Sequence, residues 1–385
     1  MEIQYEDETL VTEPETLSFN VEHESLMNAL TLCGKIIPKS GSIPILQSVK
    51  FDLMGDTLFI TAMDMSQSVL QLLKVENKSN LNGSYLFPAK EGIELVKRLP
   101  HGSLTFSKKE STVYISYGQR GKANLKILSA EEFPKLPKME AVDVTSIPIE
   151  TLRKGVLATQ FTSSDEKSPL LTGIHIYNHE GKLGFEGTDR HRILRYISEV
   201  DIINQETFVN AVINAASFKK IVDSFKDVQQ IDLLITSSHL ILRDRTTVYF
   251  GLLINGEYPD FSRIFAQMNS GTEITISREE LDDTLNRALS LDATNNRVTI
   301  EVDEEGLFVL HTQSENSELS ESFPNAKFND EFSAMKFNGK YLRSFLLILN
   351  SEIKNIILSV SGSKMPGFIK AEGDTSSIFV VNPVN

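Results

Sequence analysis

The sequence contains one cysteine and no tryptophan. A single thiol excludes an internal disulfide and a metal cluster held by several thiolates. That residue, Cys33, follows Leu26 and Leu30 at positions i, i+4 and i+7, a spacing that places all three on one face of a helix. We therefore predict that Cys33 is a buried structural residue.

Membrane and export signals are also missing. No apolar run approaches the roughly 20 residues that a membrane-spanning helix needs. Residues 1–8 are acidic, whereas a signal peptide begins with basic residues. Residues 1–16 hold six acidic side chains and no Lys or Arg, so we expect a solvated extension without a function of its own. Together with the single cysteine, these features predict a cytoplasmic protein that does not bind membranes.

Motifs for catalysis and nucleotide binding are absent as well. The sequence has no GxxxxGK[ST], no GxGxxG after a strand and no GxSxG. His175 and His179 are four residues apart, but residues 174–177 alternate like a strand, in which such positions lie roughly 13 Å apart. That separation is too large for a shared metal, so we interpret both as surface histidines. We predict no cofactor, no metal and no enzymatic activity.

What the sequence does contain is a pattern that occurs three times. In each copy an apolar strand leads into an amphipathic helix, and a later strand leads into a second helix. The second of these junctions falls at Phe87, Ile213 and Phe337, which are 126 and then 124 residues apart. This period is far longer than the roughly 20–50 residues of a solenoid or propeller unit. It is the size of a domain, so we predict three copies of one domain.

Each copy combines two helices with antiparallel strands. Val49–Leu53 and Thr57–Thr61, for example, flank a Gly55-Asp56 turn and are typical of a hairpin. Helices packed on antiparallel sheet define an α+β fold. The helices are predicted at residues 24–37, 88–98, 150–160, 215–226, 278–290 and 339–349.

The domain boundaries follow from the loops between the copies. Pro134, Pro137 and Pro148 mark the first linker, and residues 267–272 mark the second. We predict an acidic extension at residues 1–16, followed by domains at 17–140, 141–268 and 269–385.

Charge is distributed unevenly between helices and the rest of the chain. The net charge of −14 argues against a nucleic-acid partner, because duplex binding depends on Lys and Arg. The six predicted helices, however, carry +4 in total, which leaves −18 on all other residues. Chance scatter of a few lysines is the alternative explanation.

Two polar clusters remain to be explained. Gly187–Ile193 contains one carboxylate and one imidazole and could be a catalytic or metal site, but no second set of ligands lies nearby in sequence. We favour a turn in which Asp189 accepts backbone N–H groups, while the basic residues form ion pairs or line a groove. In Asn255–Arg263, Asn255-Gly256 favours a type I′ turn and Pro259 ends a strand, which predicts a domain-ending turn with aromatic side chains.

Together with the threefold repeat, these clusters resemble the bacterial β sliding clamp, the processivity subunit of the replicative DNA polymerase. Thr188–Ile193 matches the family segment Thr-Asp-Gly-His-Arg-Leu, and Gly256–Ile264 matches Gly-x-Phe-Pro-Asp-Tyr-x-Arg-Val. The resemblance covers about residues 17–385. Further matches occur in the family's order at Ile43–Leu46, Glu132–Leu136, Ala158–Phe161 and Phe379–Pro383.

The resemblance implies a head-to-tail homodimer whose six domains close a ring around duplex DNA. Helices would line the hole and meet phosphates through water without reading sequence, while the acidic exterior repels DNA. The subunit interface would pair Lys122–Leu128 of one subunit with Leu289–Leu291 of the other. The DNA-facing residues would be Lys39, Lys90, Lys97, Arg153, Lys154, Lys219, Lys220, Lys340 and Arg343.

The resemblance also implies a hydrophobic pocket between the second and third domains. In the family it receives short peptides of DNA polymerases, the clamp loader and repair proteins. Carried over by position, the pocket comprises Leu171, Thr188, His191, Arg192, Ile193, Pro259, Arg263, Ile264, Asn338, Tyr341, Val380, Val381 and Pro383.

This sequence departs from the family at several of these positions. Arg190 stands where the family has glycine, and Asn382 where many members have Met. Lys39-Ser40 and Pro169-Leu170 occupy regions of family DNA contacts, and the chain ends Pro383-Val-Asn385. Two alternatives follow: an enzyme centred on Asp189 and His191, and a divergent accessory adaptor that keeps the clamp fold but no longer loads on DNA.

Overall fold

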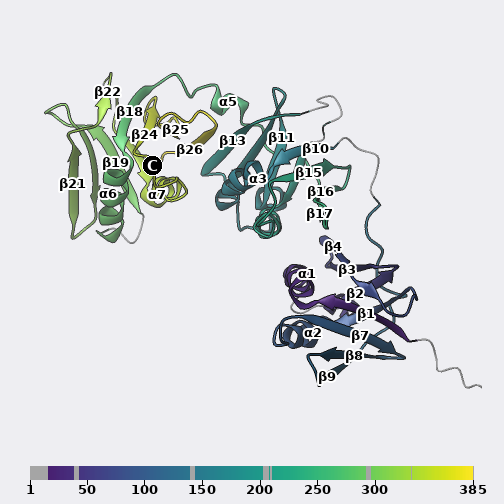
Figure 1. Cartoon of the computed structure of the whole chain (residues 1–385). Coiled ribbons are helices and arrows are strands. Elements are labelled where there is room, and N and C mark those ends of the chain that lie inside the picture. Colours follow the sequence, from purple (N-terminus) through teal and green to yellow (C-terminus); the bar gives the residue numbers. More distant parts are fainter. Residues whose placement is uncertain are drawn as a thin grey trace, which may run out of the picture. The chain divides into compact units, whose positions relative to one another are not determined.

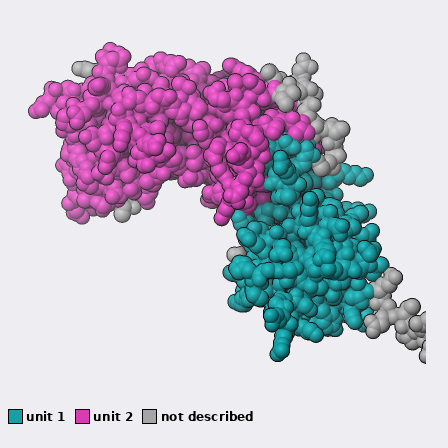
Figure 2. Space-filling view, viewed as in Figure 1, with its two compact units in different colours: residues 1–142, 231–234, 239–252 teal, residues 143–230, 235–238, 253–385 magenta. Residues whose placement is uncertain are grey.

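The computed structural model describes residues 16–38, 43–138, 144–202, 208, 210–291, 296–330 and 332–384. The chain forms two compact units (Figure 2). Unit 1 comprises residues 1–142, 231–234 and 239–252, and unit 2 comprises residues 143–230, 235–238 and 253–385. The predicted acidic extension, apart from Thr16, lies outside the described residues, and so does Lys39.

Unit 1 contains the first of the three repeats (Figure 1). Its first strand leads directly into a helix, and its sixth strand leads directly into a second helix, as the repeat predicts. The elements are β1 (Leu17–Glu22), α1 (His23–Ile36), η1 (Pro44–Gln47), β2 (Ser48–Met54), β3 (Thr57–Met63), β4 (Gln67–Lys74), β5 (Glu76–Asn77), β6 (Gly83–Pro88), α2 (Ala89–Val96), β7 (Ser103–Lys109), β8 (Thr112–Tyr117) and β9 (Gly121–Lys126).

Two antiparallel sheets form unit 1. One has the order β5-β1-β7-β8-β9. The other runs β6-β2-β3-β4 and continues through β17 (Thr247–Leu252), β16 (His239–Arg243) and β15 (Gln230–Ile235), strands of the second repeat. Where β17 meets β4, Gln71 lies opposite Thr247, and its side-chain amide donates a 2.8 Å hydrogen bond to the Thr247 hydroxyl. Both side chains are buried, so this bond satisfies polar groups inside the sheet.

Unit 2 contains the third repeat and most of the second. The same order of strand, helix, strands, strand and helix recurs in both. The elements are β10 (Thr145–Pro148), α3 (Ile149–Val156), η2 (Leu157–Phe161), η3 (Pro169–Thr172), β11 (Gly173–His179), β12 (Lys182–Thr188), β13 (Arg192–Asp201), β14 (Ala211–Asn214), α4 (Ala215–Val222), α5 (Ser262–Phe265), β18 (Thr272–Ser277), α6 (Arg278–Leu291), β19 (Arg297–Val302), β20 (Phe308–Gln313), β21 (Glu318–Phe323), β22 (Lys327–Phe328), β23 (Met335–Asn338), α7 (Gly339–Leu346), β24 (Asn355–Val360), β25 (Gly367–Ala371) and β26 (Ser377–Val381).

A nine-stranded antiparallel sheet connects the two repeats of unit 2. Its order is β14-β11-β12-β13-β26-β25-β24-β18-β22, and a separate sheet has the order β21-β20-β19-β23. The connection is the pairing of β13 with β26, in which Arg192 lies opposite Val381. The turn that precedes β13 therefore lies beside the C-terminal end of the chain, and this is where the site forms.

The helices pack in pairs: α1 contacts α2, α3 contacts α4, and α6 contacts α7. On α1, Leu26, Leu30 and Cys33 are fully buried, which confirms the predicted apolar face. Burial raises the pKa of the Cys33 thiol to about 12, because a thiolate would lose its hydration there.

Gly187 of β12 passes so close to η2 that an added Cβ would lie 2.0 Å from the carbonyl oxygen of Ala158. That close approach requires glycine.

The α+β fold, the threefold repeat and the Gly55-Asp56 hairpin are confirmed. The second helix of each repeat ends earlier than predicted, at Val96, Val222 and Leu346. After each end, two successive backbone N–H groups each donate to the carbonyl oxygen three residues earlier in the chain. The residues that follow the α-helix therefore form one tighter turn of 3-10 type, and the apolar spacing of the helix continues through this turn.

Three smaller predictions are wrong. Residues 157–160 were expected in the α3 helix but form the 3-10 segment η2. Pro148 does not mark the linker: it is the last residue of β10, as the strand expected at residues 145–149 before the α3 helix implies, and β10 pairs with β15. Asn255-Gly256 is not a type I′ turn: that turn needs positive φ at both residues, and here only Gly256 has it.

None of the helices in the described ranges is long and apolar enough to cross a membrane.

Candidate functional site

The turn between β12 and β13 is held by Asp189. One carboxylate oxygen accepts hydrogen bonds from the backbone N–H groups of His191 (3.0 Å) and Arg192 (3.1 Å). The other accepts from Nε of Arg192 at 2.8 Å. The prediction that Asp189 satisfies backbone donors in a turn is confirmed. Among the described residues, no group of three or more His, Cys, Asp or Glu could hold a metal ion.

Arg190 has the left-handed φ of +78° at the centre of this turn. Its backbone N–H donates to the Thr188 hydroxyl at 3.1 Å, and its carbonyl oxygen accepts from the Asn382 amide at 3.0 Å. The Asn382 backbone N–H donates in turn to the carbonyl of His191 at 2.9 Å. The turn is therefore fixed against the chain segment that follows β26.

A pocket of about 580 Å³ opens beside this turn. Its surface is mostly apolar, and a few polar groups stand among the apolar ones, the arrangement typical of sites that bind ligands by an apolar anchor. The lining residues are Ser168, Pro169, Leu170, Leu171, Thr188, Arg190, Ile193, Asn255, Glu257, Pro259, Phe261, Ile264 and Asn382. Five of them belong to the predicted set: Leu171, Thr188, Ile193, Pro259 and Ile264.

Three other predicted residues come together on the α7 side of the turn. The rings of His191 and Tyr341 stack with centroids 5.8 Å apart. The Arg192 guanidinium lies 4.8 Å from the Tyr341 ring and 5.2 Å from the Phe161 ring, and it donates to the Ser344 hydroxyl at 2.7 Å. These contacts form a surface of aromatic rings and one cation, separate from the lining of the 580 Å³ pocket.

The remaining predicted residues have other positions. Val380 and Val381 are 1% and 0% exposed, so their side chains lie in the core rather than on a surface. Val380 belongs to the apolar cluster against which the pocket residues Phe261 and Ile264 pack. Asn338 caps α7 by accepting from the backbone N–H of Lys340 at 3.0 Å. Arg263 is exposed on α5 and Pro383 is half-buried, and neither lines the pocket.

The other eight lining residues are absent from the predicted set: Ser168, Pro169, Leu170, Arg190, Asn255, Glu257, Phe261 and Asn382. A signal for some of them existed in the sequence. Pro169 and Leu170 share the η3 turn with Leu171, and Phe261 is one of the aromatic residues of the Asn255–Arg263 cluster. Arg190 and Asn382 were visible only as departures from a family pattern.

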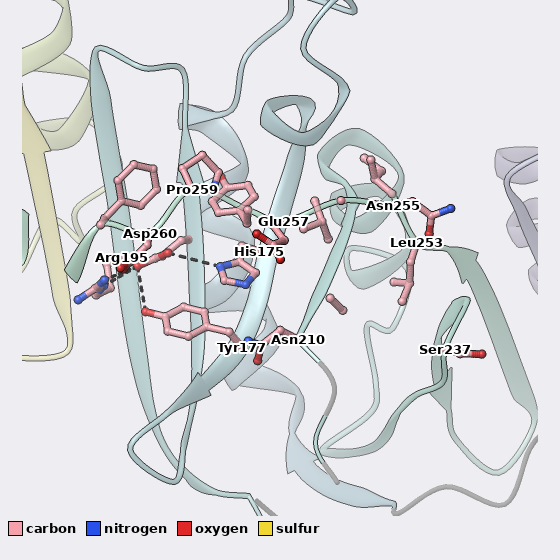
Figure 3. Close-up of a pocket in the computed structure, with 17 residues that line it drawn as sticks. His175, Tyr177, Arg195, Asn210, Ser237, Leu253, Asn255, Glu257, Pro259 and Asp260 are labelled. Atoms are coloured by element: carbon pink, nitrogen blue, oxygen red, sulfur yellow. Dashed lines mark hydrogen bonds and ion pairs between the residues drawn. The ribbon is translucent and has the colours of Figure 1, made fainter. Parts of the chain in front are cut away.

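One wall of the pocket is the segment 255–261, which also lines a second cavity of about 530 Å³ (Figure 3). Gly256 has φ +133°, and a Cβ there would lie 2.8 Å from Leu170, so glycine lets this wall lie close to η3. Asp260 accepts from the backbone N–H of Ser262 at 2.8 Å, and this hydrogen bond lowers the pKa of the Asp260 carboxyl.

Beneath this wall lies a row of polar side chains that the sequence did not predict. His175, Glu186 and Arg195 stand opposite one another on β11, β12 and β13. Glu186 is 3% exposed and accepts from Nε of Arg195 at 2.6 Å and from the Tyr177 hydroxyl at 3.0 Å (Figure 3). His175 Nδ1 lies 3.5 Å away from the carboxylate. The Arg195 guanidinium also lies 3.4 Å from the centroid of the Phe265 ring.

Opposing effects act on the Glu186 carboxyl. Burial by itself would raise its pKa, but the hydrogen bond from His175 and the charge and hydrogen bonds of Arg195 outweigh it, so the pKa lies below its usual range. His175 is stacked between Tyr177 (4.7 Å) and Tyr258 (4.6 Å). The prediction of a surface histidine is therefore wrong for His175, because its cross-strand neighbour is a buried carboxylate that draws the ring inward. The row supports Tyr258 and thereby the wall of the pocket.

The predicted DNA-facing residues divide into two groups. Arg153 and Arg343 are half-buried and paired within the chain: Arg153 with Glu150, and Arg343 with Asp282 at 2.8 Å. The six lysines that the structure describes are exposed on helices or directly after them: Lys90, Lys97, Lys154, Lys219, Lys220 and Lys340. Lys219 forms an exposed ion pair with Asp223 at 3.0 Å.

The chain matches two family models, described as the DNA polymerase III beta subunit, N-terminal domain (residues 17–137) and central domain (residues 146–260). The beta sliding clamp of Bacillus subtilis is 25% identical over 379 residues, which covers 96% of this chain and 99% of the relative. That of Streptococcus pneumoniae is 23% identical over 378 residues, with coverage of 96% and 99%.

Solved structures give the same result for the fold. The sliding clamp of Bacillus subtilis has a TM-score of 0.86 at 24% identity and covers 96% of this chain and 99% of its own. The DNA polymerase III subunit beta of Pseudomonas aeruginosa has a TM-score of 0.87 at 18% identity, with coverage of 96% and 100%.

The fold is thus that of the sliding clamps. Because the two domain models together match more than half of its residues, the chain belongs to the DNA polymerase III beta subunit family, the bacterial β sliding clamps. It is a sliding clamp for DNA polymerase, and this family consists of non-catalytic processivity factors rather than enzymes.

Proposed function

We propose that two copies of this chain close head to tail into a ring around duplex DNA in the cytoplasm. In this proposal the ring tethers the replicative DNA polymerase, and the clamp loader and repair proteins bind the same ring. The observation that carries it is the threefold repeat, in which every copy has a pair of contacting helices. Two chains would supply twelve such helices, enough to line one continuous hole.

The charge of the helices supports a loose fit around DNA. Exposed lysines on or directly after α2, α3, α4 and α7 attract phosphate, whereas the chain as a whole carries −14. The pairing of Arg153 and Arg343 with acids reduces the number of close phosphate contacts. Direct binding to DNA should therefore be weak, independent of sequence and sensitive to salt.

Exposed strand edges support the proposed subunit interface. β9 and β21 each end a sheet of the described chain, so their outer backbone groups are available to another strand. Leu128, close after β9, is 60% exposed, and Leu291, at the end of α6, is 38% exposed. We propose that residues 122–128 of one subunit pair with the third domain near residues 289–291 of the other, which closes the ring by symmetry.

The 580 Å³ pocket and the adjoining surface of His191, Arg192 and Tyr341 support binding of short partner peptides. An apolar pocket takes an anchor side chain, and the neighbouring rings and polar groups orient the peptide around it.

Two measurements together test the ring. Light scattering at micromolar concentration should give the mass of a dimer. After incubation with clamp loader and ATP, the protein should stay on a nicked circular plasmid in salt that abolishes direct binding, and it should leave the same plasmid once this is linearised. A strictly monomeric mass, or equal loss from circular and linear DNA, would show that the chain is an adaptor with a clamp fold and not a loaded ring.

A further inference from the structure

Arg190 places a positive charge at the edge of the peptide pocket. It is the one cationic residue among those that line the pocket, and its side chain is exposed. Its Nη2 donates to the Ser168 hydroxyl at 2.6 Å, which leaves the charge without an acid: in the described part of the chain no carboxylate lies within ion-pair distance of Arg190. The charge is therefore available to a ligand.

The backbone at Arg190 makes this side chain costly to the fold. A left-handed φ of +78° disfavours a residue with a Cβ by about 1 kcal/mol. Glycine or asparagine would fit with less strain, and the matching family segment has glycine at this position. Strain of this kind at the edge of a binding pocket indicates that the side chain serves the site. Hydrogen bonds from Arg190 N–H to Thr188 and from Asn382 to the Arg190 carbonyl keep the residue in place.

The opposite charge lies on a different wall of the same pocket. Glu257 belongs to the segment 255–261, and no ion pair joins it to Arg190. A carboxylate on a bound peptide would be repelled by Glu257 and attracted to Arg190, whose planar guanidinium donates two parallel hydrogen bonds to a carboxylate. The pocket thus combines a mostly apolar surface with a positive side chain on one wall and a negative side chain on another.

We propose that Arg190 makes this pocket selective for partner peptides that carry an aspartate or glutamate beside their apolar anchor. The proposal rests on the proposed function of the pocket and names the chemistry of its preferred ligand. Ser168 orients the guanidinium in the free protein and stays beside it when the carboxylate binds.

Fluorescence anisotropy with labelled peptides tests the proposal on the full chain. The probes are glutamine–leucine–phenylalanine clamp peptides in which one Asp is placed in turn at each position beside the apolar anchors, with an Asn series as the neutral match. At the best position the Asp peptide should bind about fivefold more tightly than its Asn match, and added salt should reduce the difference.

Three variants identify the source of the preference. Arg190→Asn keeps a residue that tolerates positive φ but removes the charge, and it should bring the Asp-to-Asn ratio to about one while Asn peptides bind as before. Arg190→Lys should give an intermediate ratio, because a lysine keeps the charge without the planar fork. Arg245→Asn changes the net charge equally at an exposed residue outside the pocket lining, and it should leave the ratio unchanged.

The outcomes separate this inference from the function on which it rests. Equal binding of Asp and Asn peptides at every position, or a preference that survives Arg190→Asn, would refute the selectivity alone. If no peptide of either series bound, the proposed function of the pocket would be refuted together with it.

Discussion

Arg195→Met should destabilise unit 2 by about 3 kcal/mol at neutral pH and above, because it leaves the buried Glu186 carboxylate without its cation. The two side chains are 11% and 4% exposed, so neither is screened much by water. Removal of one partner of such a pair typically costs about 3–5 kcal/mol. We expect the lower end because the Tyr177 hydroxyl still donates to the carboxylate at 3.0 Å.

The destabilisation should depend on pH, and its sign follows from the two pKa values of Glu186. In the native chain the folded pKa lies below that of an unfolded glutamate, about 4.3, so the carboxylate stabilises the fold above that pH and this contribution is lost as the pH falls through the folded pKa. In the variant, burial is opposed by His175 but no longer by Arg195, and we expect the folded pKa to rise above the unfolded value. The variant should therefore be least stable at about pH 8 and should recover part of the loss at about pH 5.

Urea unfolding followed by far-UV circular dichroism measures the effect, because the chain has no tryptophan for fluorescence. Hydrogen exchange of peptides from residues 182–201 assigns it to β12 and β13. The control is the double variant Glu186→Gln/Arg195→Met, which removes both charges and should recover most of the stability. If the double variant were as unstable as Arg195→Met at both pH values, the loss would come from packing on Phe265, and the argument from a stranded charge would be wrong.

Three further changes test other parts of the structure. Tyr341→Ala combined with truncation after Val381 should weaken binding of clamp peptides in anisotropy about tenfold or more without changing the oligomeric state of the protein, because it removes the Tyr341 ring of the adjoining surface and the pocket residue Asn382, and loss of each such contact costs about 1 kcal/mol or more; binding at native affinity would contradict the assignment of the pocket and its adjoining surface. Lys219→Glu with Lys220→Glu should reduce loading on nicked circles. The matched control, Lys108→Glu with Lys109→Glu at the end of β7, should not reduce it. Equal effects of the two double variants would mean that α4 does not face DNA. Gly187→Ala should lower stability by about 2 kcal/mol in urea unfolding, because its Cβ would lie 2.0 Å from a backbone oxygen of η2; an unchanged midpoint would show that η2 can move.

Local patterns predicted much of the fold. The face formed by Leu26, Leu30 and Cys33, the first hairpin and the threefold junction of strand and helix depend on residues close together in sequence, and periodicity reports such relations directly. Asp189 belongs to the same class, because its hydrogen bonds reach residues only two and three positions away. The domain boundaries predicted from the linkers remain predictions.

Long-range pairing explains what the sequence could not reveal. Glu186 and Arg195 face each other because of the register of β12 and β13, and Asn382 reaches the Arg190 carbonyl only because β26 pairs with β13. No local pattern reports either fact. The positive φ of Arg190 is not signalled by the residue itself, since glycine or asparagine normally marks that conformation, and only the glycine of the matching family segment pointed to it.

The buried thiol of Cys33 has a practical consequence for experiments on this protein. With no exposed surface and a pKa raised to about 12 by burial, it should react slowly with alkylating reagents, so that the native chain should behave towards them almost as if it had no cysteine. A cysteine introduced at Leu128 or Leu291 would then be the reactive thiol of its subunit. Labelling or cross-linking at such positions would test the proposed subunit interface without first removing the native residue.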